Sequence, residues 1–195
     1  SNVLDIWLMH LTEQLIERIK NAMNSYLIFK VKDLIINYID DLTNVYIKLN
    51  RPRLKGQVSV SDTITSIYTL YHNIKAILIC VAPFMPFISE YLFKKINLDT
   101  NSILLSSYTD ANVINIFGSE FNRDDELLDN ISKLKEIILA VRQLRNEICM
   151  SVRIPLKSIT IFGTKELISR IQPLEHYIRI EGNYIDIHYV ELALS

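Results

Sequence analysis

The chain has 195 residues, of which 49% are hydrophobic and 22% are charged, and its formal net charge is −1 at pH 7. This composition is typical of a folded globular protein and excludes the disordered and fibrous classes. With only four glycines and five prolines, the sequence has few residues that favour turns, and this favours long helices over a sandwich of many short strands.

Apolar residues recur at the spacing of amphipathic helices over residues 3–23 and again over about residues 27–49. The short link between them predicts two antiparallel neighbours. The second helix is expected to end at Pro52, because the residue before a proline is pushed out of the α region. Its expected core stripe includes Ile28 and Ile39.

A third helix is expected to begin near Asp62, with Ser61 or Asp62 as its N-cap, and to stop at Pro83. Pro86 suits the first position of a fourth helix, because its missing N–H is not needed there. This helix is expected to run to about Ile96.

Residues 98–122 show no sustained period and are interpreted as an irregular acidic connector. Asp124 or Asp125 is expected to cap a fifth helix that runs to about Cys149. Cys149 and Cys80 both lie in apolar periodic segments, so we interpret them as buried free thiols of a protein in a reducing compartment.

The last part of the chain changes its pattern. Residues 157–162 and 183–190 alternate with a period of two, as strands do, and residues 164–171 fit one short helix between them. The predicted fold is therefore mainly α. An antiparallel helical bundle over residues 1–152 is followed by a small strand–helix–strand extension over residues 153–195.

The motifs of reactive sites are missing, since the sequence contains no GxSxG, HExxH, Walker loop or GxGxxG. Its histidines and cysteines show no zinc spacing, so neither a catalytic residue nor a metal site is predicted. The longest apolar run, residues 74–88, is broken by two prolines and too short to span a bilayer, so no membrane partner is expected. Because the first residue is Ser and not Met, we expect a piece cut from a longer protein.

The most informative segment, residues 44–56, reads NVYIKLNRPRLKG and holds four cations and no acid. The helix dipole alone favours cations at a helix C-terminus, so a solvated helix end is one interpretation. Cations that continue past Pro52 into a loop favour phosphate contact, with Asn and Tyr able to touch bases or sugars. The candidate nucleic-acid contacts in this segment are Asn44, Tyr46, Asn50, Arg51, Arg53 and Lys55.

A second candidate pair is Arg142 and Arg145, which lie three residues apart on the predicted fifth helix and so share a face. They are able to pair with acidic residues of another helix or to meet a phosphate backbone, and periodicity does not decide between the two.

Several stretches resemble the anticodon-binding domain of class I aminoacyl-tRNA synthetases, and in particular the isoleucyl enzymes of the eukaryotic cytoplasmic type. The segment DDLTNVYIKLNRPRLKG, residues 40–56, is similar to the end of a helix in that family. The segment VAPFMPFISEYLF, residues 81–93, is similar to its APFxPFxxE step. IPLKSITIF and LEHYIRIEGN resemble the stretch that follows the bundle in isoleucyl enzymes.

The resemblance implies an all-α bundle that grips the anticodon stem and loop of an isoleucine tRNA, followed by a small mixed α/β extension. It implies a cytoplasmic parent enzyme that attaches isoleucine to this tRNA with ATP and magnesium, and whose catalytic domain lies in the same chain. The HIGH and KMSKS signatures of that catalytic domain are absent from the present sequence, and no cofactor is expected in it.

Two positions depart from the family pattern, because Val45 stands where Trp is usual and Pro52 where Arg is common. The spacing of Arg142 and Arg145 leans toward valyl enzymes, so the equivalent module of a valyl-tRNA synthetase is an alternative. A helical protein-interaction scaffold is the alternative from another class. It predicts an exposed apolar groove and no salt-sensitive affinity for RNA.

Overall fold

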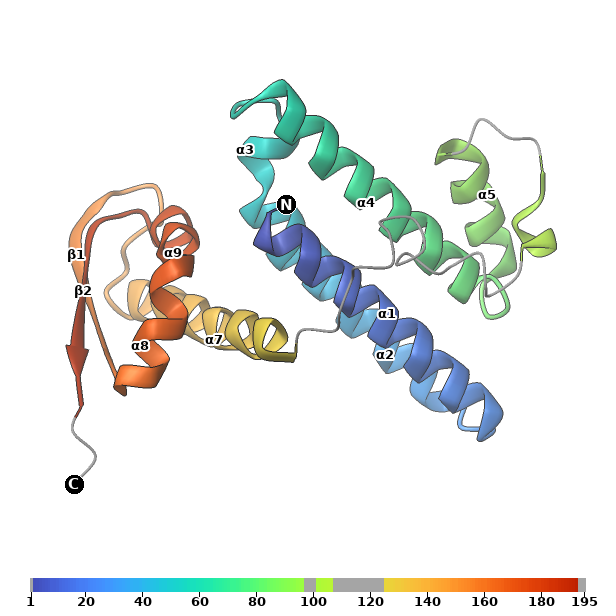
Figure 1. Ribbon diagram of the computed structural model, residues 1–195, viewed down its shortest axis with the longest axis horizontal. Coiled ribbons are helices and arrows are strands. Elements are labelled where there is room, and N and C mark those ends of the chain that lie inside the picture. The colour runs from blue at the N-terminus through green and yellow to red at the C-terminus, as the bar shows by residue number, and fades with distance from the viewer. Residues whose placement is uncertain (1, 97–100, 107–124, 193–195) are drawn as a thin grey trace. The chain divides into compact units, whose positions relative to one another are not determined.

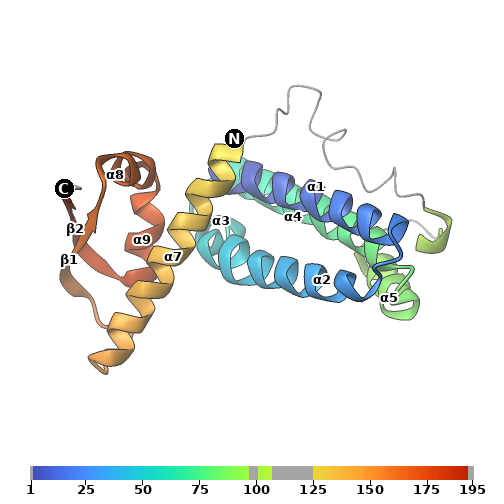
Figure 2. The ribbon, with the colours of Figure 1, turned by 90° about the horizontal axis from the view of Figure 1, so that it is seen from below.

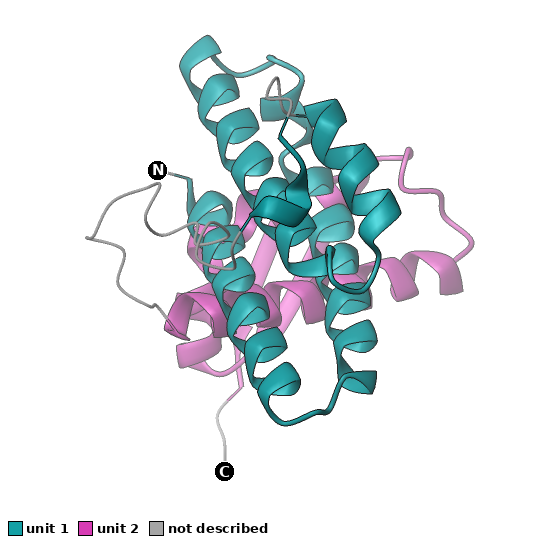
Figure 3. Cartoon of the chain, turned by 90° about the vertical axis from the view of Figure 1, so that its right-hand side faces the viewer, with its two compact units in different colours: residues 1–124 teal, residues 125–195 magenta. Residues whose placement is uncertain are grey.

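The computed structural model describes residues 2–96, 101–106 and 125–192. The chain divides into two compact units, Ser1–Asp124 (unit 1) and Asp125–Ser195 (unit 2) (Figure 3). The expected mainly α fold with a small α/β extension is confirmed, because unit 1 is helical where it is described and a two-stranded sheet lies in unit 2. The predicted connector over residues 98–122 lies largely outside the described residues.

Unit 1 is built on the long helices α1 (Val3–Asn24), α2 (Phe29–Asp41) and α4 (Val60–Val81). Helix α1 packs against both α2 and α4 (Figures 1 and 2). After α2 the chain continues as the π-helical segment η1 and the short helix α3, and after α4 as helix α5 and the 3₁₀ turn η2. These elements span Leu42–Ile47, Arg51–Leu54, Pro86–Ile96 and Ile103–Leu105 respectively.

A buried polar contact joins the three long helices. The Oγ1 atom of Thr12 in α1 lies 2.7 Å from Tyr38 Oη in α2 and 2.5 Å from Asn73 Oδ1 in α4. Buried polar groups need such partners, so the contact fixes how the three helices align. The largest fully buried apolar or aromatic side chains of unit 1 are Leu4, Leu8, Ile19, Val31, Tyr46 and Ile103.

The buried stripe of α2 is narrower than the sequence pattern predicted. It runs through Val31, Ile35 and Tyr38, which are spaced by four and three residues. Ile28 and Ile39 are exposed, so their assignment to the core is wrong. Ile28 precedes the helix, and Ile39 lies about 100° around the helix from Tyr38.

Two proline predictions have different outcomes. Helix α4 ends at Val81 and α5 begins at Pro86, so the predicted corner around Pro83 is confirmed. Pro52, in contrast, does not end the helical course. It lies in the first turn of α3, where its missing N–H removes no helical hydrogen bond.

The N-cap of α4 is Ser59 and not Ser61 or Asp62, because the Ser59 side chain accepts a hydrogen bond from the Asp62 N–H at 3.1 Å. Among the described residues, α4 is the helix long and apolar enough to cross a membrane by length and composition alone, and half of its most apolar window is buried. Its buried Asn73 is part of the polar contact with α1.

Unit 2 begins with helix α7 (Asp125–Glu147) and ends with a two-stranded parallel sheet, strands β1 (Leu156–Gly163) and β2 (Tyr184–Glu191). Both predicted strands are confirmed, with Ile159 opposite Ile187 in the register. Parallel strands need a long crossover, which α8, η4 and α9 supply. These span Lys165–Ile171, Gln172–Leu174 and Glu175–Gly182, so α9 is a helix that the sequence pattern missed.

Helix α7 packs against α8 and α9 through a buried stripe that includes Ile131, Leu134, Ile138 and Val141. This packing places α7 in unit 2, so the compact units divide after Asp124, whereas the sequence suggested a division after residue 152. Past the end of α7, Cys149 is exposed and has a positive φ of 53°, so its predicted burial is wrong, whereas Cys80 is buried as predicted.

Candidate nucleic-acid interface

The segment from Asn44 to Lys55 is helical over nearly its whole length. Backbone N–H groups of Asn50, Leu54 and Lys55 donate to the carbonyl oxygens four residues earlier, at 3.0, 2.9 and 3.1 Å. Residues three and four apart therefore share a face. This geometry divides the predicted site residues into a buried set and an exposed set.

Tyr46 belongs to the buried set, and its side chain has no exposed surface. Its hydroxyl donates to Asp5 Oδ1 at 2.8 Å and lies 3.2 Å from the carbonyl oxygen of Ser66. Tyr46 thereby ties η1 to both α1 and α4. Burial and the Asp5 carboxylate raise the pKa of the Tyr46 hydroxyl well above its ordinary value.

Arg53 is 7% exposed, and each of its five guanidinium N–H groups has a partner. Nε and Nη2 donate to Asp62 at 2.8 and 2.7 Å, and Nη1 and Nη2 donate to Asp5 at 2.9 and 2.8 Å. Nη1 also donates to Asn50 Oδ1 at 2.9 Å. We call these residues the Arg53 cluster: Asp5, Tyr46, Asn50, Arg53 and Asp62.

The charged groups of the Arg53 cluster stabilise one another in their ionised forms. Burial opposes the charge of Arg53, but the hydrogen bonds and charges of Asp5 and Asp62 outweigh it and raise the pKa of the guanidinium above its usual value. The hydrogen bonds from Arg53 in turn lower the pKa of the Asp62 carboxyl. Arg53 is thus a cation whose donors are used within the fold.

The exposed set forms a line along the outer face of the same segment. We call it the exposed stripe: Asn44, Lys48, Arg51 and Lys55. Arg51 and Lys55 form no side-chain hydrogen bond or ion pair with any described residue. Asn44 is neutral and donates to Asp40 Oδ1 at 2.5 Å. The positive charge of the stripe comes from its other three residues.

The structure therefore separates six residues that the sequence grouped together. Tyr46, Asn50 and Arg53 are enclosed, whereas Asn44, Arg51 and Lys55 face the solvent. Sequence reasoning did not connect Asp5 or Asp62 with this segment. Asp5 lies 48 residues before Arg53, and Asp62 was interpreted as a candidate N-cap. Sequence reasoning also left Lys48 out, although its position seven residues before Lys55 puts both on one helical face.

Arg142 and Arg145 lie in unit 2 and are engaged there. Arg145 is 1% exposed, and Nε, Nη1 and Nη2 donate to the carbonyl oxygens of Gly182, Ser151 and Ile154 at 2.9, 2.9 and 3.1 Å. Arg142 forms an ion pair with the buried Glu181 at 2.6 Å. Arg142 thus pairs with an acid of another helix, which is one of the two interpretations that the sequence left open, whereas Arg145 binds backbone carbonyl oxygens, which neither of them included.

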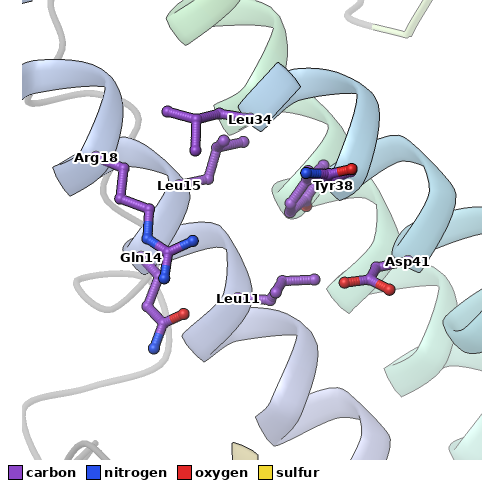
Figure 4. Close-up of a pocket in the computed structure, with 8 residues that line it drawn as sticks. Leu11, Gln14, Leu15, Arg18, Leu34, Tyr38 and Asp41 are labelled. Atoms are coloured by element: carbon purple, nitrogen blue, oxygen red, sulfur yellow. The ribbon is translucent and has the colours of Figure 1, made fainter. Parts of the chain in front are cut away.

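A groove between α1 and α2 is too small to bind a typical small-molecule ligand. Its volume is about 80 Å³, whereas such ligands occupy pockets of roughly 300–1,000 Å³. Figure 4 shows Arg18 and Asp41 on opposite sides of its apolar floor, which includes Leu15. No group of three or more potential metal ligands occurs among the residues that the structure describes.

A second cavity, of about 330 Å³, lies against α4, α5 and η2. Its lining includes the apolar residues Ile79 and Phe93 and several polar side chains. Among these side chains, Lys75 carries a charge. Ser102 also lines the cavity, and its hydroxyl donates to Glu90 Oε2 at 3.0 Å, so that hydroxyl is used within the fold and not paired with Lys75. The described residues thus present cations on a fixed helical scaffold, an arrangement suited to binding a polyanion.

Fold and site together define a helical domain suited to binding nucleic acid, and comparison with known sequences supplies its family. The model of the family described as the anticodon-binding domain of tRNA ligase matches residues 5–161. The chain belongs to this family.

The relatives found by sequence comparison include isoleucine–tRNA ligases. The cytoplasmic enzyme of Saccharomyces cerevisiae is 28% identical over 193 residues, which cover 96% of this chain and 18% of the relative. That of Schizosaccharomyces pombe is 30% identical over 188 residues, covering 94% and 18%. The enzyme of Treponema pallidum is 31% identical over 163 residues, covering 83% and 14%. The chain thus spans less than a fifth of the length of these relatives.

Proposed function

We propose that this chain is the tRNA-binding part of a cytoplasmic isoleucine–tRNA ligase, and that its exposed stripe contacts the phosphate backbone of the isoleucine tRNA. One observation carries the proposal: Arg51 and Lys55 are exposed, unpaired among the described residues, and mounted on a turn whose other face is tied into the core. The names of the Saccharomyces and Schizosaccharomyces relatives support the isoleucine and cytoplasmic parts of the proposal.

The charge arrangement fits phosphate better than a base edge. Phosphate contacts fix the position of a protein on RNA and come mainly from Arg and Lys. Arg51 and Lys55 lie four residues apart on one face, so both are able to reach the same strand. Because the Arg53 cluster orders the turn before any RNA arrives, binding loses less conformational entropy than it would from a mobile loop.

In this proposal the chemistry of the ligase belongs to the remainder of a longer chain. That remainder would activate isoleucine with ATP and magnesium and transfer it to the tRNA. The part described here supplies affinity and orientation. A tRNA held at two separate regions of one protein gains avidity from each of them, because the second contact is intramolecular.

Salt-dependent binding of the 195-residue chain to an isoleucine tRNA transcript tests the proposal. Affinity should fall steeply between about 50 and 200 mM salt. The double variant Arg51→Ala/Lys55→Ala should bind more weakly, and its salt slope should be smaller by about two, because each lost phosphate contact removes close to one unit. The matched control is Lys30→Ala/Lys32→Ala, which removes two exposed cations of α2 and should leave the slope unchanged.

The outcomes separate the parts of the proposal. Stronger binding to the isoleucine transcript than to a valine transcript supports the assignment to isoleucine, and equal binding would remove it. Equal loss in both double variants would show a nonspecific effect of charge and would take the stripe out of the interface. Absence of salt-sensitive binding would favour the protein-interaction scaffold instead.

A further inference from the structure

We propose that Asp62 is a positioning residue for the RNA contact: acting through Arg53, it sets the place of the turn that carries Arg51 and Lys55. The inference rests on the proposed function of the exposed stripe. It concerns a carboxylate that faces away from the RNA in this proposal and touches neither Arg51 nor Lys55.

Helix α3 cannot hold its own shape. It has four residues, Arg51–Leu54, and although backbone hydrogen bonds continue into it from the preceding segment, a helical turn of that length is unstable in water without further contacts. Its order therefore depends on contacts with the rest of unit 1. The structure shows which contacts these are.

Arg53 forms three hydrogen bonds with residues of the first turn of α4. Its Nε and Nη2 atoms donate to the two carboxylate oxygens of Asp62 at 2.8 and 2.7 Å, which is the bidentate geometry of a strong ion pair. Thr63 Oγ1 lies 2.9 Å from its backbone carbonyl oxygen and 2.8 Å from that of Ser59, so the one hydroxyl proton is shared between these two acceptors. Asp5 in α1 receives the remaining side of the guanidinium, so Arg53 is clamped between two helices.

Arg51 is the first residue of this short helix, two residues before Arg53, and Lys55 is its C-cap, two residues after Arg53. Adjacent helical residues point about 100° apart, so the side chains two residues away point to the opposite side from Arg53. This agrees with their exposure while Arg53 is buried. Any rotation or shift of α3 that follows the release of Arg53 moves both exposed cations together.

Charge and position predict opposite effects of removing the Asp62 charge. Asp62 is an acid close to a cationic surface, and 32% of its side chain is exposed. If charge alone mattered, Asp62→Asn would make the surface more positive and strengthen the binding of tRNA. If Asp62 positions the turn, the same change weakens binding, because an amide offers one acceptor in place of two and the bidentate pair is lost.

The experiment measures the affinity of the 195-residue chain for an isoleucine tRNA transcript at several salt concentrations, well below the unfolding temperature of each variant. Asp62→Asn should weaken binding and reduce the salt slope by about one to two. Asp62→Glu should restore part of the loss. Asp33→Asn is the matched control, because Asp33 is an exposed acid of α2 without a side-chain partner among the described residues, and its loss should leave the slope unchanged or strengthen binding slightly.

A second variant tests the attachment without changing any charge. Thr63→Val removes the hydroxyl that the Arg53 and Ser59 carbonyl oxygens share and should weaken binding in the same direction as Asp62→Asn. If Asp62→Asn bound tRNA as tightly as the parent chain or more tightly, with the parent salt slope, the positioning role would be wrong. A lower unfolding temperature with unchanged affinity would show a purely structural role and would overturn the proposal equally.

These results can be told apart from a failure of the proposed function. If Arg51→Ala/Lys55→Ala bound like the parent chain, the exposed stripe would not be the interface, and the positioning role would fall with it. If that double variant lost affinity while Asp62→Asn and Thr63→Val did not, the interface would stand and the positioning role alone would be overturned.

Discussion

The hydroxyl of Tyr46 donates a hydrogen bond to Asp5 Oδ1 at 2.8 Å, although 41 residues separate them in the chain. The same oxygen accepts a hydrogen bond from Arg53 Nη1 at 2.9 Å. One carboxylate at the start of α1 thus ties down two residues of the segment that, in sequence, has the composition of an RNA contact. This segment has an inner face that binds the protein and an outer face on which Arg51 and Lys55 are exposed.

Removing the Tyr46 hydroxyl should destabilise the protein without altering the outer face. In Tyr46→Phe the buried Asp5 carboxylate loses one donor, and a hydrogen bond to a charged group contributes about 1.5–3 kcal/mol. We therefore expect the free energy of unfolding in urea to fall by about that amount. Tyr26→Phe is the control, since Tyr26 is 88% exposed, and it should change stability very little.

The tRNA affinity of the same variant tests the alternative, in which Tyr46 contacts RNA. If folded Tyr46→Phe lost affinity while its stability stayed at that of the parent chain, Tyr46 would act in binding rather than in packing. Its full burial in the structure argues against this result.

The ion pair between Arg53 and Asp62 predicts how stability depends on pH in the acid range. The folded-state pKa of Asp62 is lowered by Arg53, so its contribution to stability is present above the unfolded-state pKa, near 3.8, and is lost as the pH falls through the folded value. The difference in unfolding free energy between the parent chain and Asp62→Asn should thus be largest near neutral pH and should shrink below about pH 4.

Urea titrations of both proteins at several pH values between about 7 and 3 measure this difference, across the range in which carboxylates of ordinary pKa become protonated. A difference that stays constant across the series would show that the Asp62 charge contributes nothing to the stability of the folded chain. Arg53 keeps its charge throughout, because its own pKa is raised.

Sequence reasoning succeeded where a local rule decides the structure. Pro83 and Pro86 mark a helix end and a helix start, and the period of two marks both strands, because backbone geometry at those positions depends on near neighbours. Helix α9 in the crossover between the strands was missed, although its sequence EHYIRIEG has a helical period.

The direction in which each cation points could not be predicted from composition. Arg51, Arg53 and Lys55 look alike in sequence, and Pro52 suggested a loop in which all three face outward. The outcome depends on Asp5, which lies 48 residues before Arg53, and on a helical course that resumes after Pro52. A long-range acid that captures one of several nearby arginines leaves no local pattern.

Arg145 was unpredictable for a different physical reason. Its partners are backbone carbonyl oxygens at Gly182, Ser151 and Ile154, and every residue has such an oxygen. No residue type in the sequence therefore marks them as acceptors. Spacing alone placed Arg142 and Arg145 on one face and left open whether they pair with an acid or meet phosphate; in the fold Arg142 pairs with Glu181.

Gly182 and Gly56 should respond differently to a methyl group. A Cβ at Gly182 would lie 2.5 Å from Tyr184 Cδ2 and 3.1 Å from Val141 Cγ1, so Gly182→Ala should destabilise unit 2 through overpacking, by about 1–3 kcal/mol. Gly56 has φ of +73°, and a Cβ there would meet only Thr63 Oγ1 at an ordinary 4.0 Å, so Gly56→Ala should cost only about 1 kcal/mol of backbone strain.

Thermal unfolding of the two alanine variants checks the contrast. A smaller loss in Gly182→Ala than in Gly56→Ala would mean that the Tyr184 ring moves aside without penalty. The equivalent comparison in tRNA binding should show no change of salt slope for Gly182→Ala, because this substitution lies in unit 2 and alters no charge.

The two cysteines should differ in reactivity toward a disulfide reagent. Burial raises the pKa of the Cys80 thiol to about 12, and Cys80 has no exposed surface, whereas Cys149 is exposed. Because the thiolate is the reactive form, folded protein at about pH 8 should release one equivalent of thionitrobenzoate quickly, and the second only after unfolding. Cys149→Ser should abolish the fast equivalent; a fast equivalent that survived in this variant would contradict the burial of Cys80.

Replacing Arg145 should weaken unit 2 and leave the RNA contact of unit 1 intact. In Arg145→Met the carbonyl oxygens of Gly182, Ser151 and Ile154 lose a charged donor, and leaving such groups without partners costs about 1–3 kcal/mol each, so we expect a loss of at least about 3 kcal/mol. Hydrogen exchange should accelerate at the amides of β1 and β2. Arg153→Met removes an exposed arginine nearby and is the control for the loss of charge.

The salt dependence of tRNA binding by Arg145→Met separates this structural role from the RNA contact that the sequence left open. At a temperature where the variant is folded, its slope should equal that of the parent chain, because the guanidinium is enclosed and contacts carbonyl oxygens. A slope smaller by about one, with the exchange pattern of β1 and β2 unchanged, would instead place Arg145 on the phosphate backbone.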